Sequence, residues 1–416
     1  MKVYLEVYGC TANKSDASLV KGLIEESEHE LVKSKDEADS IVVLTCTVID
    51  TTEQRMLSKI KKLKELGKKI IVAGCMASVQ QDKIRSIIPE ADLLPPQYSH
   101  HIVEMLEGKK PKFVEKNKTQ SPKYFDDIFA PISISEGCMF SCSYCITSLA
   151  RGKLKSYPID EIKKDICHAI SKGCKEIQLT SQDTSSYGFD LDNNLGDLLR
   201  EIKQIDGDYR IRVGMMNPYT CLKNLESIIS GFDSPNIYKF LHIPVQSGNN
   251  DILAKMNRKY TVNDFIKIVE NFKEKFQGIT ISTDVIVGFP SESDEQFHDT
   301  VKLMETIKPD ITNITRFSAR PFTKAKLMNG RISTDVAKER SKEITEACSR
   351  ISKENNRRHI GKKYTILITE KGKKNSFVGR AGNYKPVVIK KQVKIGEFIP
   401  VEIVEAKATY LVGSIK

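Results

Sequence analysis

The chain has 416 residues, with 65 Lys and Arg against 54 Asp and Glu, a formal net charge of +11, ten cysteines and no tryptophan. Hydrophobic residues make up 40% of the sequence and charged residues 29%, which excludes a disordered chain. No apolar run approaches the ~18 residues of a membrane helix, and Glu6 comes too early for a secretory signal. We therefore expect a cytoplasmic protein with no membrane partner.

The first hundred residues alternate apolar runs with charged segments of helical period. The apolar runs are residues 3–8, 40–47 and 69–74, and the segments between them include 15–28 and 52–66. Near-continuous apolar strands that alternate with helices predict a parallel α/β sheet. We assign this pattern to a domain over residues 1–107, followed by a polar linker over residues 108–130.

From residue 131 a second alternating pattern begins, with six strand candidates separated mostly by helices. The strand candidates are residues 132–135, 176–180, 210–214, 238–244, 279–287 and 311–317, and the helical segments are 159–172, 195–205, 224–229, 261–276 and 294–307. Six βα repeats are two short of a complete barrel, so the pattern predicts a partial (β/α)6 barrel over residues 131–358, which ends in a long charged helix. Such barrels place their chemistry at the C-terminal ends of the strands.

The last segment, residues 359–416, changes character to short β-rich runs broken by glycines, which predicts a small antiparallel barrel. Residues 360–416 contain twelve Lys and Arg but four Asp and Glu, so +8 of the +11 lies here. This concentration of charge is typical of phosphate-backbone binding, although a solvated basic surface is the alternative. Three aromatic residues are candidates for base stacking or for core packing: Tyr364, Phe377 and Tyr384.

Three cysteines, Cys138, Cys142 and Cys145, share one loop directly after the first barrel strand. Thiolates at this spacing can converge on one metal centre, and a [4Fe–4S] cluster usually takes four cysteines. With three, one iron stays open to an outside ligand, as cleavage of S-adenosylmethionine (SAM) requires. A zinc site is the alternative, but it needs a fourth nearby Cys or His, and the next histidine, His168, lies in a predicted helix.

A second set, Cys10, Cys46 and Cys75, stands at or just beyond the C-terminal ends of the three N-terminal strands. Because these ends face one crevice in an open parallel sheet, we expect the three residues to be neighbours and to form a second three-cysteine cluster site. Three buried structural cysteines are the alternative. The remaining cysteines have no partners at ligand spacing and are interpreted as structural: Cys167, Cys174, Cys221 and Cys348.

Two three-cysteine sets, a partial barrel and a small β-barrel resemble the radical SAM methylthiotransferase family over nearly the whole chain. Cys138, Cys142 and Cys145 match the superfamily's CxxxCxxC motif, and residues 8–16 resemble the family's opening GCxxNxxD. Further stretches resemble its archaeal and eukaryotic branch more than the bacterial ones: residues 135–147, 150–154, 179–184, 216–218, 242–247 and 283–290. That branch methylthiolates N6-threonylcarbamoyladenosine at position 37 of tRNA, beside the anticodon, and ends in an RNA-binding TRAM domain.

The resemblance implies two [4Fe–4S] clusters with different tasks. The cluster at Cys138, Cys142 and Cys145 would receive an electron from a donor and cleave one SAM to methionine and a 5′-deoxyadenosyl radical. The auxiliary cluster at Cys10, Cys46 and Cys75 would hold the sulfur, and a second SAM would supply the methyl group.

The C2–H bond of the adenine has no acidic proton, so a cofactor radical must activate it, and no catalytic residues are assigned beyond the cluster ligands. Polar residues at barrel strand ends are candidates for holding SAM: Ser181, Gln182, Asp183, Gln246 and Asp284. Arg151 could neutralise a carboxylate or phosphate, or form a surface ion pair.

Two departures from the family pattern lie in predicted loops. Ser291 and Phe322 stand where the family usually has glycine.

Alternative functions stay open. The substrate could instead be N6-isopentenyladenosine in tRNA or a ribosomal-protein aspartate, although the basic β-barrel favours RNA. A non-enzymatic iron–sulfur RNA-binding protein is the alternative from another class.

Overall fold

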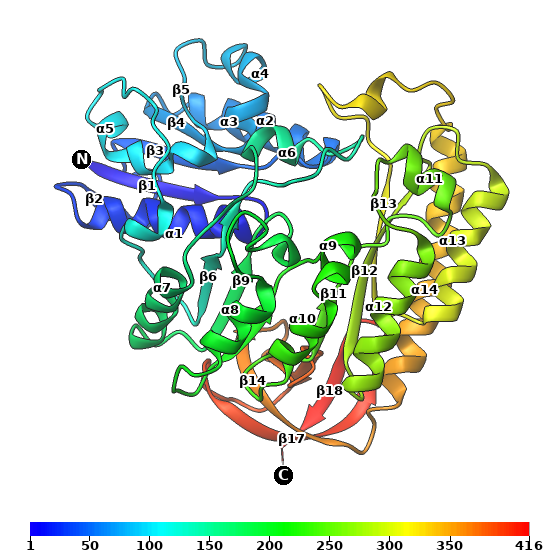
Figure 1. Ribbon diagram of the computed structural model, residues 1–416. Coiled ribbons are helices and arrows are strands. Elements are labelled where there is room, and N and C mark those ends of the chain that lie inside the picture. Colours follow the sequence, from blue (N-terminus) through cyan, green and yellow to red (C-terminus); the bar gives the residue numbers. More distant parts are fainter. Residues whose placement is uncertain (416) are drawn as a thin grey trace. The chain divides into compact units, whose positions relative to one another are not determined.

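The computed structural model describes residues 1–415, which form two compact units (Figure 1). The first unit contains residues 1–172, 178–182 and 318–326, and the second contains residues 173–177, 183–317 and the chain from 327 onward. Among the described residues, no helix combines the length and the apolar character needed to cross a membrane.

The first unit begins with a parallel sheet of the predicted kind. Its strands have the order β2-β1-β3-β4-β5 and comprise β1 (Lys2–Val7), β2 (Glu30–Val32), β3 (Ser40–Thr45), β4 (Lys69–Gly74) and β5 (Asp92–Leu94). The two outermost strands were not expected, because runs of three residues are too short to show a strand pattern in sequence.

Helices cover both faces of this sheet (Figure 1). Ile41 and Val43 of β3 pack with Met56 and Ile60 on one face, whereas the alternating residues of β3 pack on the other. The helices are α1 (Thr11–Glu25) and α5 (Ile102–Leu106) on the second face, and α2 (Asp50–Lys64), α3 (Cys75–Val79) and α4 (Gln81–Arg85) on the first. The expected layered α/β arrangement is therefore confirmed.

The segment predicted as a polar linker is packed into the first unit. Lys118, at the start of the short 3-10 helix η2 (Lys118–Gln120), is 5% exposed, and Lys123 is 7% exposed. Each lysine is paired with a buried or largely buried carboxylate, since Lys118 Nζ lies 2.6 Å from Asp16 and Lys123 Nζ lies 2.5 Å from Asp165. Composition alone could not reveal these partners, which come from α1 and from α7 (Ile159–Ser171).

The first barrel strand and the end of the second belong to the first unit. The amide of Ile134, just after β6 (Phe129–Ser133), donates to the carbonyl of Thr180 at the end of β9 (Glu176–Thr180). The cysteine loop that follows is framed by β7 (Ser135–Glu136), α6 (Thr147–Arg151) and β8 (Lys155–Ser156), with β7 and β8 paired antiparallel.

The second unit carries the other barrel strands and confirms the partial barrel. Its strands are β10 (Arg210–Val213), β11 (Phe240–His242), β12 (Thr280–Val287) and β13 (Ile311–Arg316), of which β11, β12 and β13 form a parallel sheet. Its helices are α8 (Leu195–Ile202), α9 (Pro218–Lys223), α10 (Leu225–Phe232), α11 (Asn250–Lys255), α12 (Val262–Lys275), α13 (Asp294–Ile307) and the long α14 (Thr334–Arg357).

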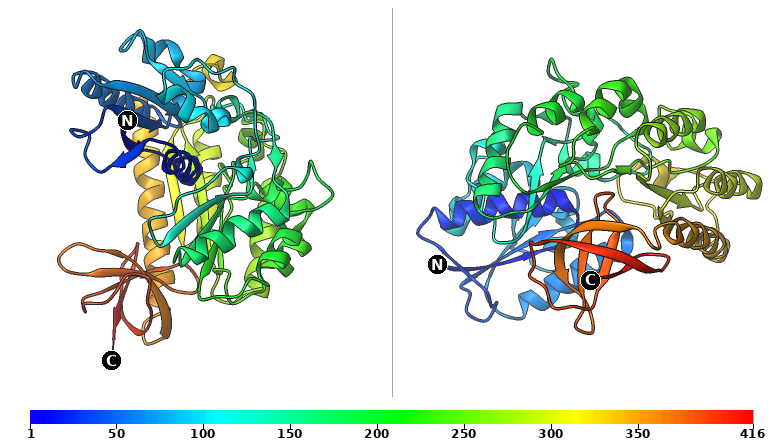
Figure 2. Two further views of the ribbon diagram at one scale, coloured as in Figure 1. Left: turned by 90° about the vertical axis from the view of Figure 1, so that its left-hand side faces the viewer. Right: turned by 90° about the horizontal axis from the view of Figure 1, so that it is seen from below.

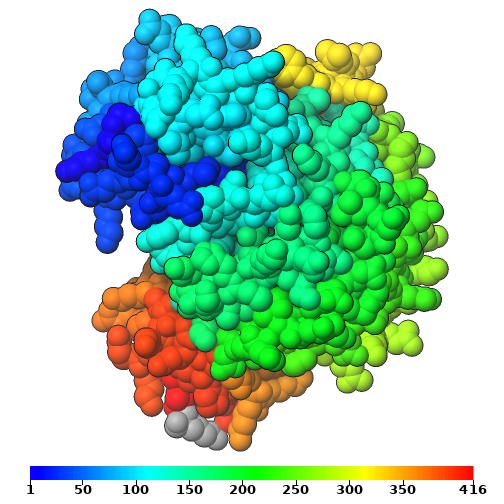
Figure 3. All heavy atoms as spheres, turned by 60° about the vertical axis from the view of Figure 1, so that its left-hand side comes forward, coloured from blue at the N-terminus to red at the C-terminus, as the bar shows by residue number. Residues whose placement is uncertain are grey.

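The C-terminal segment forms a closed barrel with the order β14-β15-β16-β18-β17 (Figure 2). Its strands are β14 (Lys363–Lys371), β15 (Phe377–Arg380), β16 (Pro386–Ile389), β17 (Phe398–Ala406) and β18 (Leu411–Ser414). The last strand was not predicted, and its parallel pairing with β16 closes an otherwise antiparallel barrel. In the space-filling view, the orange and red atoms of this barrel form a continuous surface (Figure 3).

This barrel is anchored to the rest of the second unit by buried polar contacts. Lys385 Nζ lies 2.6 Å from the Asp310 carboxylate and 2.9 Å from the Asn356 amide oxygen. Tyr384 packs against Tyr238 and its hydroxyl lies 3.2 Å from Glu176. The loop between β15 and β16 is therefore an internal contact of the unit.

Candidate metal centre

The three N-terminal cysteines lie at one edge of the parallel sheet. Cys10 directly precedes α1, Cys46 follows β3, and Cys75 is the first residue of α3 after β4. Thr45 pairs in register with Gly74, so the chain leaves β3 and β4 at the same level. Cys46 and Cys75 are buried, whereas Cys10 is exposed. The structure thus brings the second predicted set together.

Two glycines with left-handed backbone allow this close approach. Gly9 has φ = 103°, and a Cβ built on it would lie 2.8 Å from Cys46 Cβ and 3.3 Å from Cys46 Sγ. Gly74 has φ = 88°, and its Cβ would lie 2.6 Å from the carbonyl oxygen of Thr45. Any side chain at either position would force apart the strand ends that carry the cysteines.

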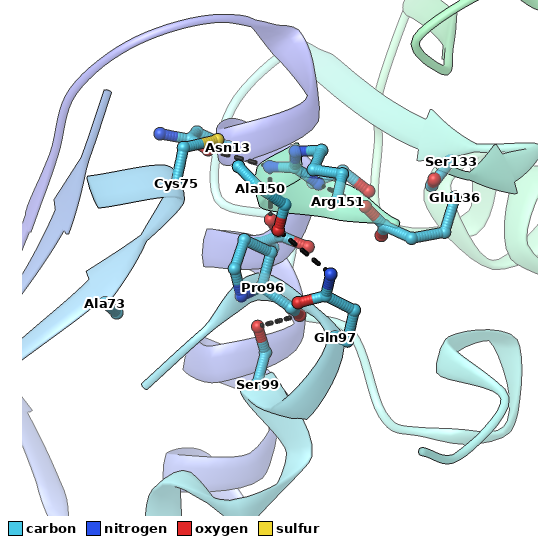
Figure 4. A network of polar contacts seen from close by, with 12 residues as sticks. Asn13, Ala73, Cys75, Pro96, Gln97, Ser99, Ser133, Glu136, Ala150 and Arg151 are labelled. Atoms are coloured by element: carbon cyan, nitrogen blue, oxygen red, sulfur yellow. Dashed lines mark hydrogen bonds and ion pairs between the residues drawn. The ribbon is translucent and has the colours of Figure 1, made fainter. Parts of the chain in front are cut away.

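Asn13, on the first turn of α1, ties the three strand ends together. Its Nδ2 donates to the carbonyl of Tyr8 at 2.7 Å and to that of Thr45 at 2.9 Å. Its Oδ1 lies 4.0 Å from Cys75 Sγ and accepts a hydrogen bond from Arg151 at 2.8 Å. Figure 4 shows Asn13 between Cys75 and Arg151.

The chemistry of the three thiols suits an electropositive ligand. Burial raises the pKa of Cys75 to about 12 and also raises the pKa of Cys46. Because the thiolate is the metal-binding form, a cationic group must offset this desolvation. Within residues 1–415, no three His, Cys, Asp or Glu side chains are arranged to hold a single metal ion. An iron–sulfur cluster binds its cysteine thiolates through separate irons, so three cysteines at one edge of the sheet suit a cluster.

The loop that carries Cys138, Cys142 and Cys145 leaves all three side chains partly exposed. At its start, the Cys138 amide donates to the Gly152 carbonyl at 3.0 Å, and at its end the Cys145 amide donates to the Cys142 carbonyl at 3.1 Å. Gly137 has φ = 75°, and a Cβ there would lie 1.9 Å from the carbonyl oxygen of Lys153. The loop therefore closes on itself at a position that only glycine can occupy.

Arg151 is not the surface residue that one interpretation of the sequence expected. Its side chain is 2% exposed and forms ion pairs with Asp16 at 2.8 Å and with Glu136 at 2.7 Å. Lys118 bridges the same two carboxylates at 2.6 Å each. The carboxylates that Arg151 neutralises belong to the chain itself, and nothing in the sequence indicated that Asp16, Lys118 and Glu136 would meet.

Residues 318–326 also reach both cysteine sets, which sequence reasoning did not detect. Arg320 donates to Thr47, next to Cys46, at 3.0 Å and pairs with the buried carboxylate of Glu53. Five residues later, the Ala325 amide donates at 2.7 Å to the carbonyl of Ser143, within the Cys138–Cys145 loop.

Two of the five candidate SAM residues, Ser181 and Gln182, lie in the first unit, directly after β9. The Oε1 atom of Gln182 is buried without a hydrogen-bond partner among the described residues. Because a buried polar atom without a partner is costly, this position fits a ligand that donates a hydrogen bond. Both residues stay candidates.

The other three candidates, Asp183, Gln246 and Asp284, lie in the second unit. Asp183 is 1% exposed and accepts hydrogen bonds from the Asn217 amide and the Thr220 hydroxyl, so its carboxylate has internal partners. Asp284 also has protein partners, since its Oδ1 lies 3.1 Å from His242 Nε2 and accepts a bond from Asn313. Gln246, four residues after β11, forms an isolated bridge with Val285 and has a left-handed backbone with φ = 71°, a conformation that often marks a functional position.

The three aromatic residues of the C-terminal barrel have packing roles. Phe377 is 4% exposed in the barrel core. Tyr384 lies under the Arg380 guanidinium, and burial raises its pKa to about 12. Tyr364 packs against the same core and hydrogen-bonds to His359. The exposed residues of the barrel include lysines at the end of β14 (371), in the turn that follows it (373 and 374) and after β16 (390 and 391).

The remaining cysteines do not gather into a site. Cys174, Cys221 and Cys348 are buried, and Cys167 is exposed on α7. Burial raises the pKa of both Cys221 and Cys348, as expected for inert core thiols.

Comparisons with known proteins agree with this arrangement. Family models match residues 132–304 (radical SAM superfamily), 2–95 (uncharacterized protein family UPF0004) and 357–416 (TRAM domain). A protein of Archaeoglobus fulgidus named "Probable threonylcarbamoyladenosine tRNA methylthiotransferase" is 40% identical, with 100% of this chain and 99% of the relative covered. The human threonylcarbamoyladenosine tRNA methylthiotransferase is 33% identical, with 99% of this chain and 73% of the relative covered.

Solved structures show the same fold at low sequence identity. The radical SAM methyltransferase TsrM from Kitasatospora setae, with cobalamin and a [4Fe-4S] cluster bound, is 13% identical and has a TM-score of 0.57, covering 78% of this chain and 76% of TsrM. The cobalamin-dependent SAM radical enzyme OxsB in its apo form is 12% identical, with a TM-score of 0.55 over 83% of this chain and 56% of OxsB.

Proposed function

The chain belongs to the family of threonylcarbamoyladenosine tRNA methylthiotransferases, and we propose that it methylthiolates C2 of N6-threonylcarbamoyladenosine at position 37, in the tRNA anticodon loop. The enzyme is a radical SAM transferase that uses SAM and iron–sulfur chemistry. Its product is 2-methylthio-N6-threonylcarbamoyladenosine, and it needs an electron donor as a further partner.

One observation carries the mechanism that we propose. Both three-cysteine sets lie in the same compact unit, and shared polar contacts of Asn13 and Arg151 link the residues that flank them. A protein with a single cluster has no need for a second set of cysteines at the edge of a sheet. We assign one [4Fe–4S] cluster to Cys138, Cys142 and Cys145 and an auxiliary one to Cys10, Cys46 and Cys75.

When bound, these clusters would supply the electron for reductive cleavage of one SAM and the sulfur atom for transfer, while a second SAM would serve as methyl donor. The chain's own residues would bind and orient the clusters and SAM, and they exclude water from the site. Cys46 and Cys75 are withdrawn from solvent, and Asn13 and the two glycines fix their backbone. Gln182 offers a buried acceptor for SAM, and Ser181, Asp183, Gln246 and Asp284 are further candidate contacts.

We propose that the C-terminal barrel binds the tRNA backbone through its exposed turn lysines. In this proposal, residues 1–107 form the domain that holds the auxiliary cluster, and residues 131–358 form the radical SAM domain. Residues 359–416 form the RNA-binding domain, and residues 108–130 connect the first two domains. The family relationship favours threonylcarbamoyladenosine over N6-isopentenyladenosine or a ribosomal-protein aspartate as substrate.

The test is an anaerobic reaction of the reconstituted protein with SAM, reductant and threonylcarbamoylated tRNA. Mass spectrometry of the nucleosides should show the gain expected for SCH3 in place of hydrogen. Parallel reactions with isopentenylated tRNA and with unmodified tRNA should give no such product. Methylthiolation of the isopentenylated tRNA alone would overturn the substrate assignment.

Two cysteine variants separate the tasks of the two sites. Cys10→Ala should abolish the methylthiolated product while 5′-deoxyadenosine still forms, because SAM cleavage depends on the other set. Cys142→Ala should abolish both. Loss of SAM cleavage in Cys10→Ala, or product at the wild-type level, would contradict the two-cluster assignment.

A further inference from the structure

Arg151 lies at the centre of a buried polar network that the cluster assignment does not use. Its guanidinium donates to Asn13 Oδ1 at 2.8 Å, to Asp16 Oδ2 at 2.8 Å and to Glu136 Oε1 at 2.7 Å (Figure 4). Lys118 donates to the second oxygens of both carboxylates. The two cations and two anions balance, so the network is neutral before any cysteine thiolate is counted.

One side of this network faces the N-terminal cysteines. Arg151 donates to Asn13 Oδ1 at 2.8 Å, and the same oxygen lies 4.0 Å from Cys75 Sγ. Arg151 therefore places a buried positive charge one side chain away from the proposed Cys75 ligand.

The Nε atom of Arg151 is buried and has no hydrogen-bond partner among the described residues. A donor left unsatisfied beside a buried charge is costly, and the other nitrogens of the same guanidinium are engaged by the chain. This orphaned donor indicates an acceptor that the chain does not provide. A thiolate or sulfide sulfur of a bound cluster has that chemistry.

The other side of the network holds the second cysteine loop. Glu136 is separated from Cys138 only by Gly137, and the Cys138 amide is bonded to the carbonyl of Gly152, the residue after Arg151. Arg151 thus directly precedes one end of this backbone bridge, and it contacts Glu136, two residues before the other end.

We infer that Arg151 is a positioning residue for the proposed auxiliary cluster: its Nε donates a hydrogen bond to a sulfur of that cluster, while its other nitrogens hold Asn13 beside Cys75 and the Cys138 loop through Glu136. The inference rests on the two-cluster assignment above. A hydrogen bond to a ligand sulfur stabilises the more negative, reduced state of a cluster. Arg151 therefore raises the reduction potential of the auxiliary cluster.

The experiment isolates the auxiliary cluster in a Cys142→Ala background, with EPR-monitored redox titration as the readout. Arg151→Lys keeps the network's charge but removes the planar guanidinium and its Nε. The ratio of reduced to oxidised cluster at a fixed potential should fall about tenfold, a shift of 59 mV for one electron. Glu136→Gln keeps Arg151 and removes a nearby negative charge, so it should shift the potential in the opposite direction.

The matched control is Lys123→Arg, which exchanges the buried cation that pairs with Asp165, away from the cysteines. It should leave the potential unchanged. Wild-type potentials in both Arg151→Lys and Glu136→Gln would overturn the positioning role. If Arg151→Lys does not hold a cluster, the Glu136→Gln shift decides alone. A Cys142→Ala protein without iron would overturn the two-cluster assignment itself, and the inference with it.

Discussion

Arg320 and Glu53 are 267 positions apart in the chain, yet they form an ion pair whose side chains are 3% and 0% exposed. Glu53 also accepts hydrogen bonds from Gln80 and Lys83, and Arg320 also donates to Thr47. The pair fixes residues 318–326 beside Cys46 and completes the first unit from a distant part of the chain.

Replacing Glu53 by Gln should destabilise the protein strongly, because it leaves Arg320 buried without its counter-charge. Breaking a buried ion pair on one side costs about 3–5 kcal/mol, so the urea midpoint of unfolding should fall accordingly. Lys83→Gln is the matched control, since Lys83 is 47% exposed and such a pair contributes at most about 1 kcal/mol. If the urea midpoint fell equally in the two variants, the contact with Arg320 would have no special structural role.

The same carboxylate predicts a pH dependence. Burial by itself would raise the pKa of Glu53, but hydrogen bonds from Lys83, Gln80 and Arg320 outweigh burial and hold its pKa below the ordinary value. A lowered folded-state pKa contributes stability above the unfolded-state pKa of about 4.3, and the contribution is lost as pH falls through the folded value. We therefore expect the free energies of unfolding of wild type and Glu53→Gln, measured from pH 7 downward, to converge only below about pH 4. If the difference in unfolding free energy already decreased between pH 7 and 5, the pKa of Glu53 would not be lowered in the folded protein.

Gly137→Ala should disrupt the Cys138 loop. The added methyl group would overlap the Lys153 carbonyl oxygen in addition to straining a left-handed backbone, and the combined cost is about 3 kcal/mol or more. Gly67→Ala is the control, because Gly67 has φ = 64° but nothing within 4 Å of the new Cβ, and it should lose only about 1 kcal/mol. Thermal unfolding and iron content should both separate the two variants. Normal iron incorporation in Gly137→Ala would show that the loop tolerates rearrangement.

Much of this architecture was predictable, because it depends on regular patterns. β4 and α13 were predicted with their observed bounds, and the N-terminal cysteine set followed from the rule that parallel strands end at one edge. The same rule could not identify Arg320 as a neighbour of Thr47, because that contact depends on how a late loop folds back.

Sequence patterns are least informative where side-chain pairing decides the structure. Lys118 and Lys123 lie in a segment whose composition indicates a solvated linker, yet carboxylates on α1 and α7 draw both lysines into the interior. Likewise, the C-terminal barrel contains both exposed lysines and buried aromatic residues. The residue types alone did not distinguish a ring that could stack on a base from a core ring such as Phe377.

Phe322 occupies a left-handed backbone conformation, which favours glycine over a residue with a side chain. Its φ is 64° and it is 74% exposed, so its ring gains little burial while the left-handed backbone costs about 1–2 kcal/mol. Phe322→Gly should therefore raise stability by up to about 1 kcal/mol, because the entropy of glycine offsets part of the gain. Lys324→Gly, an exposed change in the same segment, should lower stability. A lower melting temperature for both variants would show that the Phe322 ring makes a stabilising contact.

The turn between β14 and β15 offers a direct test of the RNA-binding proposal. Lys374 and Asn375 have left-handed backbones, with φ of 52° and 56°, and Lys373 and Lys374 are exposed there. The double variant Lys373→Gln/Lys374→Gln should weaken tRNA binding about tenfold and reduce the slope of log K against log salt by about 1 per lysine. SAM cleavage without tRNA should be unchanged, because all six proposed ligand cysteines lie in the first unit. Lys61→Gln/Lys62→Gln on α2 removes the same charge from another surface. If both double variants lower affinity and slope equally, net charge alone drives binding and the barrel has no special role.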